Sequence, residues 1–283
     1  MNHTRTMPTL FVSHGSPMIA LETAAAGAFM QRLGPALDRT FGRPRAIVAI
    51  SAHSVAREPV LLAADAHHTV HDFGGFPDAL YELHYDAPGA SALAPRVEQL
   101  LRDAGLPIHR LGEGGLDHGI WIPLRFSYPD ADVPVLPLAY PAHWPPARLF
   151  ALGRALAPLR DDGVLVLGSG SMTHNLRMVF GGGRPAVDAA EVPESAAFRA
   201  WFAARGTAAD WPALFDYRAQ APHAALMHPT DEHLLPWYVA AGAGHDAPAL
   251  RVHDSLTYGC LAMDAYAFGA GAAAMATALA DAD

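Results

Sequence analysis

The chain has 283 residues, and its composition excludes several classes of protein before any motif is considered. All 19 basic side chains are arginines, so enzymes that need a lysine amine, such as Schiff-base and pyridoxal-phosphate enzymes, are excluded. The formal net charge of -9 is opposite in sign to the charge that nucleic-acid binding requires. Histidine is in surplus with 16 copies, and histidine is the commonest metal ligand and acid–base side chain near neutral pH.

Length and composition also predict the general class and location of the protein. Hydrophobic residues make up 51% and charged residues 17%, which is typical of a globular chain, and one domain over residues 1–283 is expected. The single cysteine, Cys260, excludes an intramolecular disulfide framework. No apolar signal segment opens the chain, and no stretch of about 18 apolar residues occurs. A cytoplasmic protein with no membrane partner and no nucleic-acid partner is therefore expected.

Short apolar runs of strand length recur along the chain, separated by longer stretches with helical spacing. Strands are predicted at 10–12, 46–50, 133–138 and 164–167. Helices are predicted over 90–105, 148–160 and the alanine-rich tail 261–280. The prolines of 133–138 favour an edge or irregular strand there. The alternation predicts an α/β fold, a three-layer sandwich with a central, largely parallel or mixed sheet.

Histidines follow three of the predicted strands. Two strands end just before His14 and His53, and a third run leads through 168–171 to His174. Ligands gather outside the carboxyl ends of strands in open α/β sheets, so these histidines could converge on one metal. The glycines and serines beside them would let backbone and ligand approach closely. The alternative is that each histidine forms a hydrogen bond within its own turn, because none of the spacings forms a compact zinc motif.

A fourth histidine, His233, precedes another apolar segment. Thr230 is the expected N-cap of a short helix, which would place His233 at the third helical position. The acidic residues between them suit a helix start, where the helix dipole favours negative charge. His233 could then face the sheet edge as a further ligand, with the less constrained His228 as the alternative.

Two loops with paired glycines contain further candidates. His118 lies in the loop 114–119, where Asp117 could affect the charge of its imidazole, although a surface loop is the alternative. The segment 71–77 combines two phenylalanines with a Gly-Gly pair. It could form an aromatic-lined flap over a pocket, and a well-packed loop is the alternative.

Taken in this order, these segments resemble the LigB-type (class III) extradiol ring-cleavage dioxygenases, in particular the small bacterial and plant branch that includes the DOPA dioxygenases. The resemblance covers most of the chain and depends on the ordered set, because each motif alone is short. The matching segments are 13–17, 51–53, 71–89, 116–119, 168–176 and 229–236.

The resemblance implies a metal centre with defined roles for five histidines. His14, His53 and His233 would bind one divalent metal, either Fe(II) for dioxygenase activity or Zn(II). His174 would lie beside the metal as the acid–base residue or as a fourth ligand. His118 would line the pocket for substrate and oxygen.

The sequence departs from the ligand set of the better-studied members of the family, which use two histidines and a glutamate. Here Glu232 stands next to His233, so either side chain could be the third ligand. His233 is the favoured one, with Glu232 as its hydrogen-bond partner or as a helix cap. A site of three or four histidines also suits zinc better than a site with a carboxylate ligand.

The activity implied by the resemblance is the opening of a catechol-type ring, with a small aromatic diol and O2 as partners. A zinc-dependent hydrolase that uses the same histidines and a non-catalytic binding protein with this fold are the alternatives. Arg177 could pair with a carboxylate of the substrate, and a surface salt bridge is its alternative role. The sequence leaves the oligomeric state open, and a homodimer is a common assembly for such enzymes.

Overall fold

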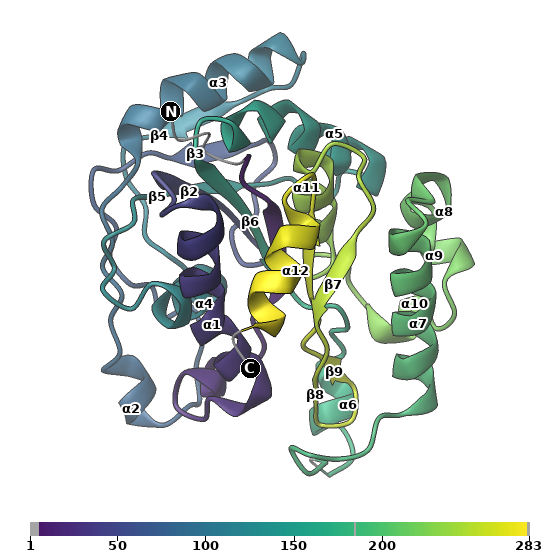
Figure 1. The fold of residues 1–283 in the computed structure, drawn as a ribbon. Helices are drawn as coiled ribbons and strands as arrows, with labels where there is room; N and C mark the ends of the chain where they lie inside the picture. Colours follow the sequence, from purple (N-terminus) through teal and green to yellow (C-terminus); the bar gives the residue numbers. More distant parts are fainter. Residues whose placement is uncertain (1–5, 184, 282–283) are drawn as a thin grey trace.

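The computed structural model describes residues 6–183 and 185–281, which are built around a mixed eight-stranded sheet (Figure 1). Its strand order is β4-β3-β5-β2-β6-β1-β10-β7. The strands are β1 (Thr9–Ser13), β2 (Ala46–Ser51), β3 (Val60–Leu62), β4 (His109–Leu111), β5 (Val135–Ala139), β6 (Val164–Gly170), β7 (Leu250–His253) and β10 (Ala265–Phe268). The four inner strands β5, β2, β6 and β1 are parallel, whereas β10 and β3 run antiparallel to them.

Helices cover both faces of this sheet, as predicted for a three-layer α/β sandwich. One face packs against α1 (Ala24–Phe41), α4 (His118–Ser127) and α12 (Ala272–Ala280). The other face packs against α3 (Ala94–Asp103), α5 (Pro146–Leu156), α7 (Pro193–Thr207) and α11 (Leu235–Ala243). The period of two in β1 separates the two cores, because Leu10 and Val12 belong to the first cluster and Phe11 to the second. The predicted fold class is confirmed.

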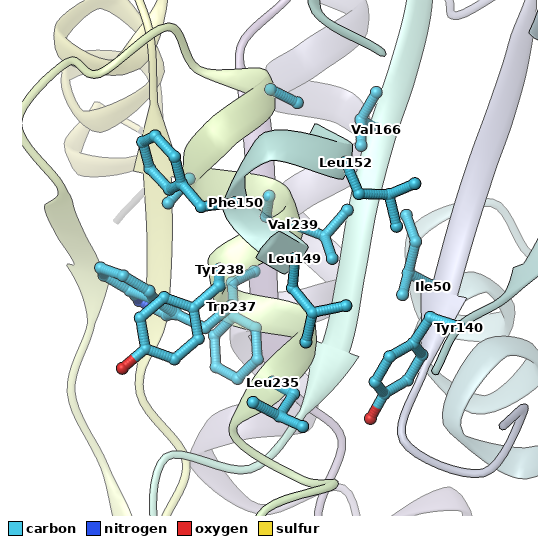
Figure 2. Close-up of a cluster of buried hydrophobic side chains, with 14 of the residues drawn as sticks. Ile50, Tyr140, Leu149, Phe150, Leu152, Val166, Leu235, Trp237, Tyr238 and Val239 are labelled. Carbon is cyan, nitrogen blue, oxygen red and sulfur yellow. The ribbon is translucent and has the colours of Figure 1, made fainter. Parts of the chain in front are cut away.

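Figure 2 shows part of the second core, where α5 and α11 pack together against β2 and β6. Leu149 and Leu152 of α5 and Val239 of α11 are fully buried there. The two helices approach very closely, since a Cβ atom on Gly153 would lie 2.0 Å from the carbonyl oxygen of Val239. This contact fixes α11 against α5, and Gly168 of β6 allows a similarly close approach of the start of α11 to the sheet.

Smaller elements connect the main helices and strands. They are α2 (Asp78–Tyr81), α6 (Leu176–Phe180), α8 (Trp211–Phe215), α9 (Tyr217–Gln220), α10 (Ala224–Met227), the 3-10 turns η1 (Pro17–Ala20), η2 (Ser91–Leu93) and η3 (Ala157–Arg160), and the hairpin of β8 (Leu256–Thr257) and β9 (Leu261–Ala262). Figure 1 shows α2, α6 and the β8–β9 hairpin at the lower end of the view. Within the described ranges, no helix combines the length and the apolar character that crossing a bilayer requires.

The strands predicted at 10–12, 46–50 and 164–167 are confirmed, but the position expected for 133–138 is wrong. This run forms β5, a fully buried inner strand between β3 and β2. The prolines are tolerated because β3 is short and pairs only with Leu138 and Ala139, so Pro137 lies outside that antiparallel pairing. The missing amide hydrogen of Pro137 therefore interrupts no ladder on the β3 side.

The helix predicted over 261–280 is also only partly correct. Its first half forms β9 and β10, and the helix α12 begins at Ala272. The residues of β10 are buried between β1 and β7, and this pairing outweighs the helical propensity of its alanines. The predicted helices at 90–105 and 148–160 are present as α3 and α5, each adjoined by a 3-10 turn.

Candidate metal centre and active-site pocket

The carboxyl ends of β1, β2 and β6 bring the predicted histidines to one place. His14 follows β1 directly, and His53 lies in the turn after β2. His233 reaches the same point from the turn that precedes α11. The ring centroids of His14 and His53 are 5.0 Å apart, and those of His233 lie 5.5 Å from His14 and 5.0 Å from His53. One nitrogen from each ring lies within 4.8 Å of the other two, which is the spacing of a metal site.

Hydrogen bonds orient the imidazole of His14. Ser169, near the end of β6, donates its hydroxyl proton to the carbonyl oxygen of Gly119, so its oxygen is left to accept a hydrogen bond from Nδ1 of His14 at 3.0 Å. The proton of His14 therefore resides on Nδ1, and Nε2 carries the free lone pair. That Nε2 atom lies 3.1 Å from Nε2 of His53.

A carboxylate lies beside Nδ1 of each of the other two imidazoles. Nδ1 of His53 faces Asp72 at 3.6 Å, and Nδ1 of His233 donates to Oε1 of Glu232 at 3.0 Å. Histidines that bind metals usually donate their second ring N–H to a carboxylate, a carbonyl or a hydroxyl. Nδ1 of His14 and Nδ1 of His233 are thus hydrogen-bonded to an oxygen, which leaves Nε2 of both rings free, while Asp72 lies beside Nδ1 of His53. The carboxylate of Glu232 is engaged with His233 and with the hydroxyl of Thr230.

The electrostatics of the cluster keep the imidazoles of His14 and His53 neutral. Burial, followed by the neighbouring histidines, lowers the pKa of His14 well below its usual value and that of His53 to about 3. The hydrogen bond from His233 lowers the pKa of Glu232 to about 2, so this group is a carboxylate at neutral pH. Neutral imidazoles are the form that binds a metal ion.

His118 lies beside these rings and has a partner that the sequence analysis did not assign. Its backbone N–H donates to Asp72 at 2.9 Å, and its Nδ1 lies 3.0 Å from both oxygens of that carboxylate. Burial would raise the pKa of Asp72, but the hydrogen bonds from His118 outweigh burial and lower it. Asp72 therefore bridges His118 and His53, whose ring centroids are only 4.0 Å apart.

Asp117, considered as the partner of His118, has a different contact. It accepts hydrogen bonds from the hydroxyls of Ser51 at 2.6 Å and Ser54 at 2.5 Å. These bonds tie the start of α4 to the turn after β2, which carries His53. Asp117 thus fixes the position of a predicted ligand through the backbone.

His174 completes the cluster of five histidines. Its ring stacks on that of His233, with centroids 3.4 Å apart and planes 10° apart. Burial and then His233 lower the pKa of His174 to about 3, so its ring is neutral and able to accept a proton. Its backbone N–H donates to the carbonyl oxygen of Met227 at 2.9 Å. His228, the alternative ligand, is fully buried and bound through Nε2 to the carbonyl oxygen of Met172 at 2.8 Å.

The turn that carries His233 differs from the prediction for this segment. Thr230 does not cap a helix, because its hydroxyl donates to Glu232 and α11 begins only at Leu235. The turn lies directly on the end of β6. Ser171 N–H donates to the carbonyl oxygen of His233 at 2.8 Å, and a Cβ atom on Gly170 would lie 2.0 Å from that oxygen. Only glycine at position 170 lets the turn approach so closely.

The histidines form the floor of a cavity of about 720 Å³. The segment 71–77 contributes Phe73 and Phe76 to the walls, as expected for an aromatic flap, and the Phe73 ring meets that of His118 at 5.6 Å. Ser171, Leu176, Val179, Phe180, Tyr258 and Leu261 also line the cavity. Arg177 is exposed and does not line it.

The residues missed at the sequence level are those that hold the histidines. Asp72 and Ser169 both lay within segments singled out for other reasons, the aromatic flap and the small-residue run at 168–171. An acidic residue beside a histidine in a proposed flap was the available signal for Asp72. No sequence signal pairs Ser169 with His14, because 155 residues separate them.

The donor set fits a divalent metal ion. Three imidazoles each bring a ring nitrogen to one point, and two of them, His14 and His233, are held by an oxygen acceptor on Nδ1. A pocket of this kind at the carboxyl edge of a mixed α/β sheet is typical of a metal-dependent enzyme with a small, partly apolar substrate.

The comparisons with known proteins identify the family. The chain matches the family described as the catalytic LigB subunit of aromatic ring-opening dioxygenase over residues 8–269. It is 37% identical to the 4,5-DOPA dioxygenase extradiol of Beta vulgaris over 263 residues, which are 92% of this chain and 96% of that protein. The protein of the same name from Escherichia coli K12 is 40% identical over 249 residues, 86% of this chain and 87% of that protein.

A solved structure has the same fold. The crystal structure of the uncharacterized protein JW3007 from Escherichia coli K12 superposes with a TM-score of 0.74 at 32% identity, over 93% of this chain and all 100% of that one. The chain therefore belongs to the LigB family of aromatic ring-opening dioxygenases. The prediction of an extradiol ring-cleaving enzyme is confirmed at the level of this class.

Proposed function

We propose that this enzyme opens the ring of a catechol-type substrate next to the diol, and that its metal is a ferrous ion held by His14, His53 and His233. The observation that carries the proposal is the set of three imidazoles whose ring nitrogens lie within 4.8 Å of one another on the floor of a partly apolar pocket. Ferrous iron bound there would supply the redox chemistry that couples O2 to the ring and open positions for the reactants.

His174 is proposed as the group that takes a proton from a substrate hydroxyl. It is neutral before substrate arrives, and it lines the pocket beside His233. A diol that loses a proton brings negative charge next to the imidazole ring of His174. That charge raises the pKa of a nearby imidazole, so proton acceptance becomes favourable when substrate is bound.

His118 is proposed as the second residue that moves a proton. Asp72 binds its Nδ1, which leaves Nε2 for the contents of the pocket. The hydrogen bond to Asp72 fixes the orientation of the ring, so Nε2 of His118 is placed to pass a proton to reduced oxygen. Phe73 and Phe76 would exclude water from the aromatic ring of the substrate during this step. Both oxygen atoms of O2 enter the product, a muconic semialdehyde-type compound.

Oxygen uptake tests the proposal. Protein reconstituted anaerobically with Fe(II) should consume one O2 per catechol and form a yellow ring-opened product, while the Zn(II) form should consume none. Failure to turn over any catechol after iron reconstitution would contradict the proposal. Ester or amide hydrolysis by the zinc form without oxygen uptake would instead identify a zinc hydrolase.

Replacing Asp72 with asparagine is expected to lower kcat by about tenfold to a hundredfold, the usual effect of losing a residue that orients an active-site histidine. The amide keeps the size of the side chain but loses the negative charge that holds Nδ1–H of His118. Steady-state kinetics with iron-loaded protein would measure the change. Asp65→Asn is the matched control, because Asp65 is exposed and lies outside the pocket. An unchanged kcat would exclude the role proposed for Asp72.

The domain organisation, the cellular location and the assembly of the protein stay predictions. We propose that the chain acts as one catalytic domain, since a single main sheet runs between both large hydrophobic clusters in the described residues. A cytoplasmic location and a homodimeric assembly are expectations from the sequence alone.

A further inference from the structure

One acidic side chain lines the pocket without taking part in the histidine cluster. Glu22 borders the cavity of about 720 Å³ and also an adjoining cavity of about 230 Å³. The two cavities share Gly15, Ser16, Met18 and Tyr258 as further lining residues. Glu22 therefore lies between the larger cavity, which contains the histidines, and the smaller one.

The chain between His14 and Glu22 is a hydrogen-bonded turn, which holds the backbone of Glu22 in place. Ser16 is the N-cap of η1 and receives hydrogen bonds on its side chain from Met18 N–H at 3.4 Å and on its carbonyl from Ile19 N–H at 3.0 Å. The carbonyl oxygen of Met18 then accepts from Glu22 N–H at 2.8 Å. The backbone of Glu22 is thus held by the same turn that leaves the predicted ligand His14.

Glu22 also differs from the other carboxylates near the site. Asp72 and Glu232 are both bound to histidines and do not line the pocket. Over residues 6–183 and 185–281, Glu22 is the one carboxylate that lines the larger cavity, and it forms no ion pair. Its side chain is exposed. Its charge is therefore available to a ligand.

The cavity is large enough for an aromatic ring that carries a substituent. Clefts of about 300–1,000 Å³ take drug-sized ligands, so a single aromatic ring at the histidines leaves much of the cavity unfilled. A substituent on the ring would extend along the walls of the pocket. One direction open to it is along η1, from His14 toward Glu22.

We infer that Glu22 is a specificity-determining residue that binds a cationic substituent, of the alkylammonium class, on the catechol substrate. The inference rests on the proposed function, because it assumes that the diol end of the substrate lies at the histidines. Glu22 would act on the choice of substrate, while the histidines carry out the chemistry. A catechol with an anionic substituent would meet repulsion from the same carboxylate.

Glu22 has an alternative role as a stabiliser of α1. The helix begins at Ala24, and a negative charge near a helix start stabilises the helix dipole. In that case a substitution would change the stability of the protein and leave the choice of substrate as it was. The experiment must therefore compare substrates as well as variants.

The test uses iron-loaded protein and three catechols of similar size whose side chains are cationic, neutral and anionic: dopamine, 4-ethylcatechol and 3,4-dihydroxyphenylpropionate. In the wild type, kcat/KM should be highest for dopamine. In Glu22→Gln, the ratio of kcat/KM for dopamine to that for 4-ethylcatechol should fall by about fivefold to tenfold, the size expected for one charge-assisted contact. In Glu22→Arg, the anionic catechol should become the preferred one of the two charged substrates.

Glu194→Gln is the matched control, because Glu194 also lies at a helix start, in the first turn of α7, but does not line the pocket. It should leave the ratio unchanged. Turnover of 4-ethylcatechol with an equal ratio in the wild type and in Glu22→Gln would overturn this inference alone. Absence of turnover with all three substrates would overturn the proposed function, and the inference with it.

Discussion

Replacement of His233 by alanine is expected to abolish ring cleavage and to weaken iron binding by about a hundredfold or more, because one of three ligands is lost. His233 is 6% exposed, and Glu232 holds its Nδ1, so the ring has a fixed position in the site. Metal content after dialysis and oxygen uptake with catechol are the two measurements. We expect activity to fall by on the order of a thousandfold or more.

His143→Ala is the control for this substitution, since His143 is exposed and lies outside the pocket. It should retain both iron and activity. Full iron occupancy in His233→Ala would remove His233 from the ligand set. In that case Glu232→Gln should lose the metal instead, because Glu232 is the other side chain that this turn brings to the cluster.

Replacement of His174 by alanine is expected to lower kcat by about a hundredfold to ten-thousandfold, the range for loss of a general acid–base residue. Most of the iron should remain bound, because the three proposed ligands are intact. The stacked position of the ring, 3.4 Å from His233, leaves space for a small molecule once it is removed. Added imidazole should therefore restore part of the activity of His174→Ala.

The matched comparison is His174→Gln, which fills more of the space and cannot accept a proton at neutral pH. It should be as inactive as the alanine variant but insensitive to imidazole. Loss of iron from His174→Ala in parallel with activity would make His174 a fourth ligand. Iron retention with normal kcat would exclude a role in proton transfer.

The inner strands could be predicted because their signal is local. β1, β2 and β6 are buried on both faces and therefore appear as continuous apolar runs followed by glycine, serine and histidine. β10 is equally buried, but it lies in an alanine-rich tail, and alanine has the highest helix propensity. Its strand conformation depends on pairing with β1, more than 250 residues earlier in the chain, where Thr9 faces Phe268.

The same distinction holds for the site. The positions of His14 and His53 follow from the strands that they end, so their convergence was predictable once a parallel sheet was assumed. The partners of these histidines were not predictable. Asp72 and His118 are 46 residues apart in the sequence, and Ser169 and His14 are 155 residues apart. Local spacing cannot predict contacts between residues so far apart in the chain. The order of the motifs along the chain identifies His233 as a candidate ligand. The helix expected to contain it begins later, at Leu235.

The close contact between the end of β6 and the turn of His233 has a consequence for engineering. Side chains larger than hydrogen cannot be accommodated at Gly170 without displacing the carbonyl oxygen of His233, and a Cβ atom on Gly168 would lie 2.5 Å from that of Pro236. A mutant library aimed at new substrates should therefore leave this strand end fixed. The rim residues Met18, Leu176 and Phe180 line the pocket away from that contact, and they are the positions to diversify.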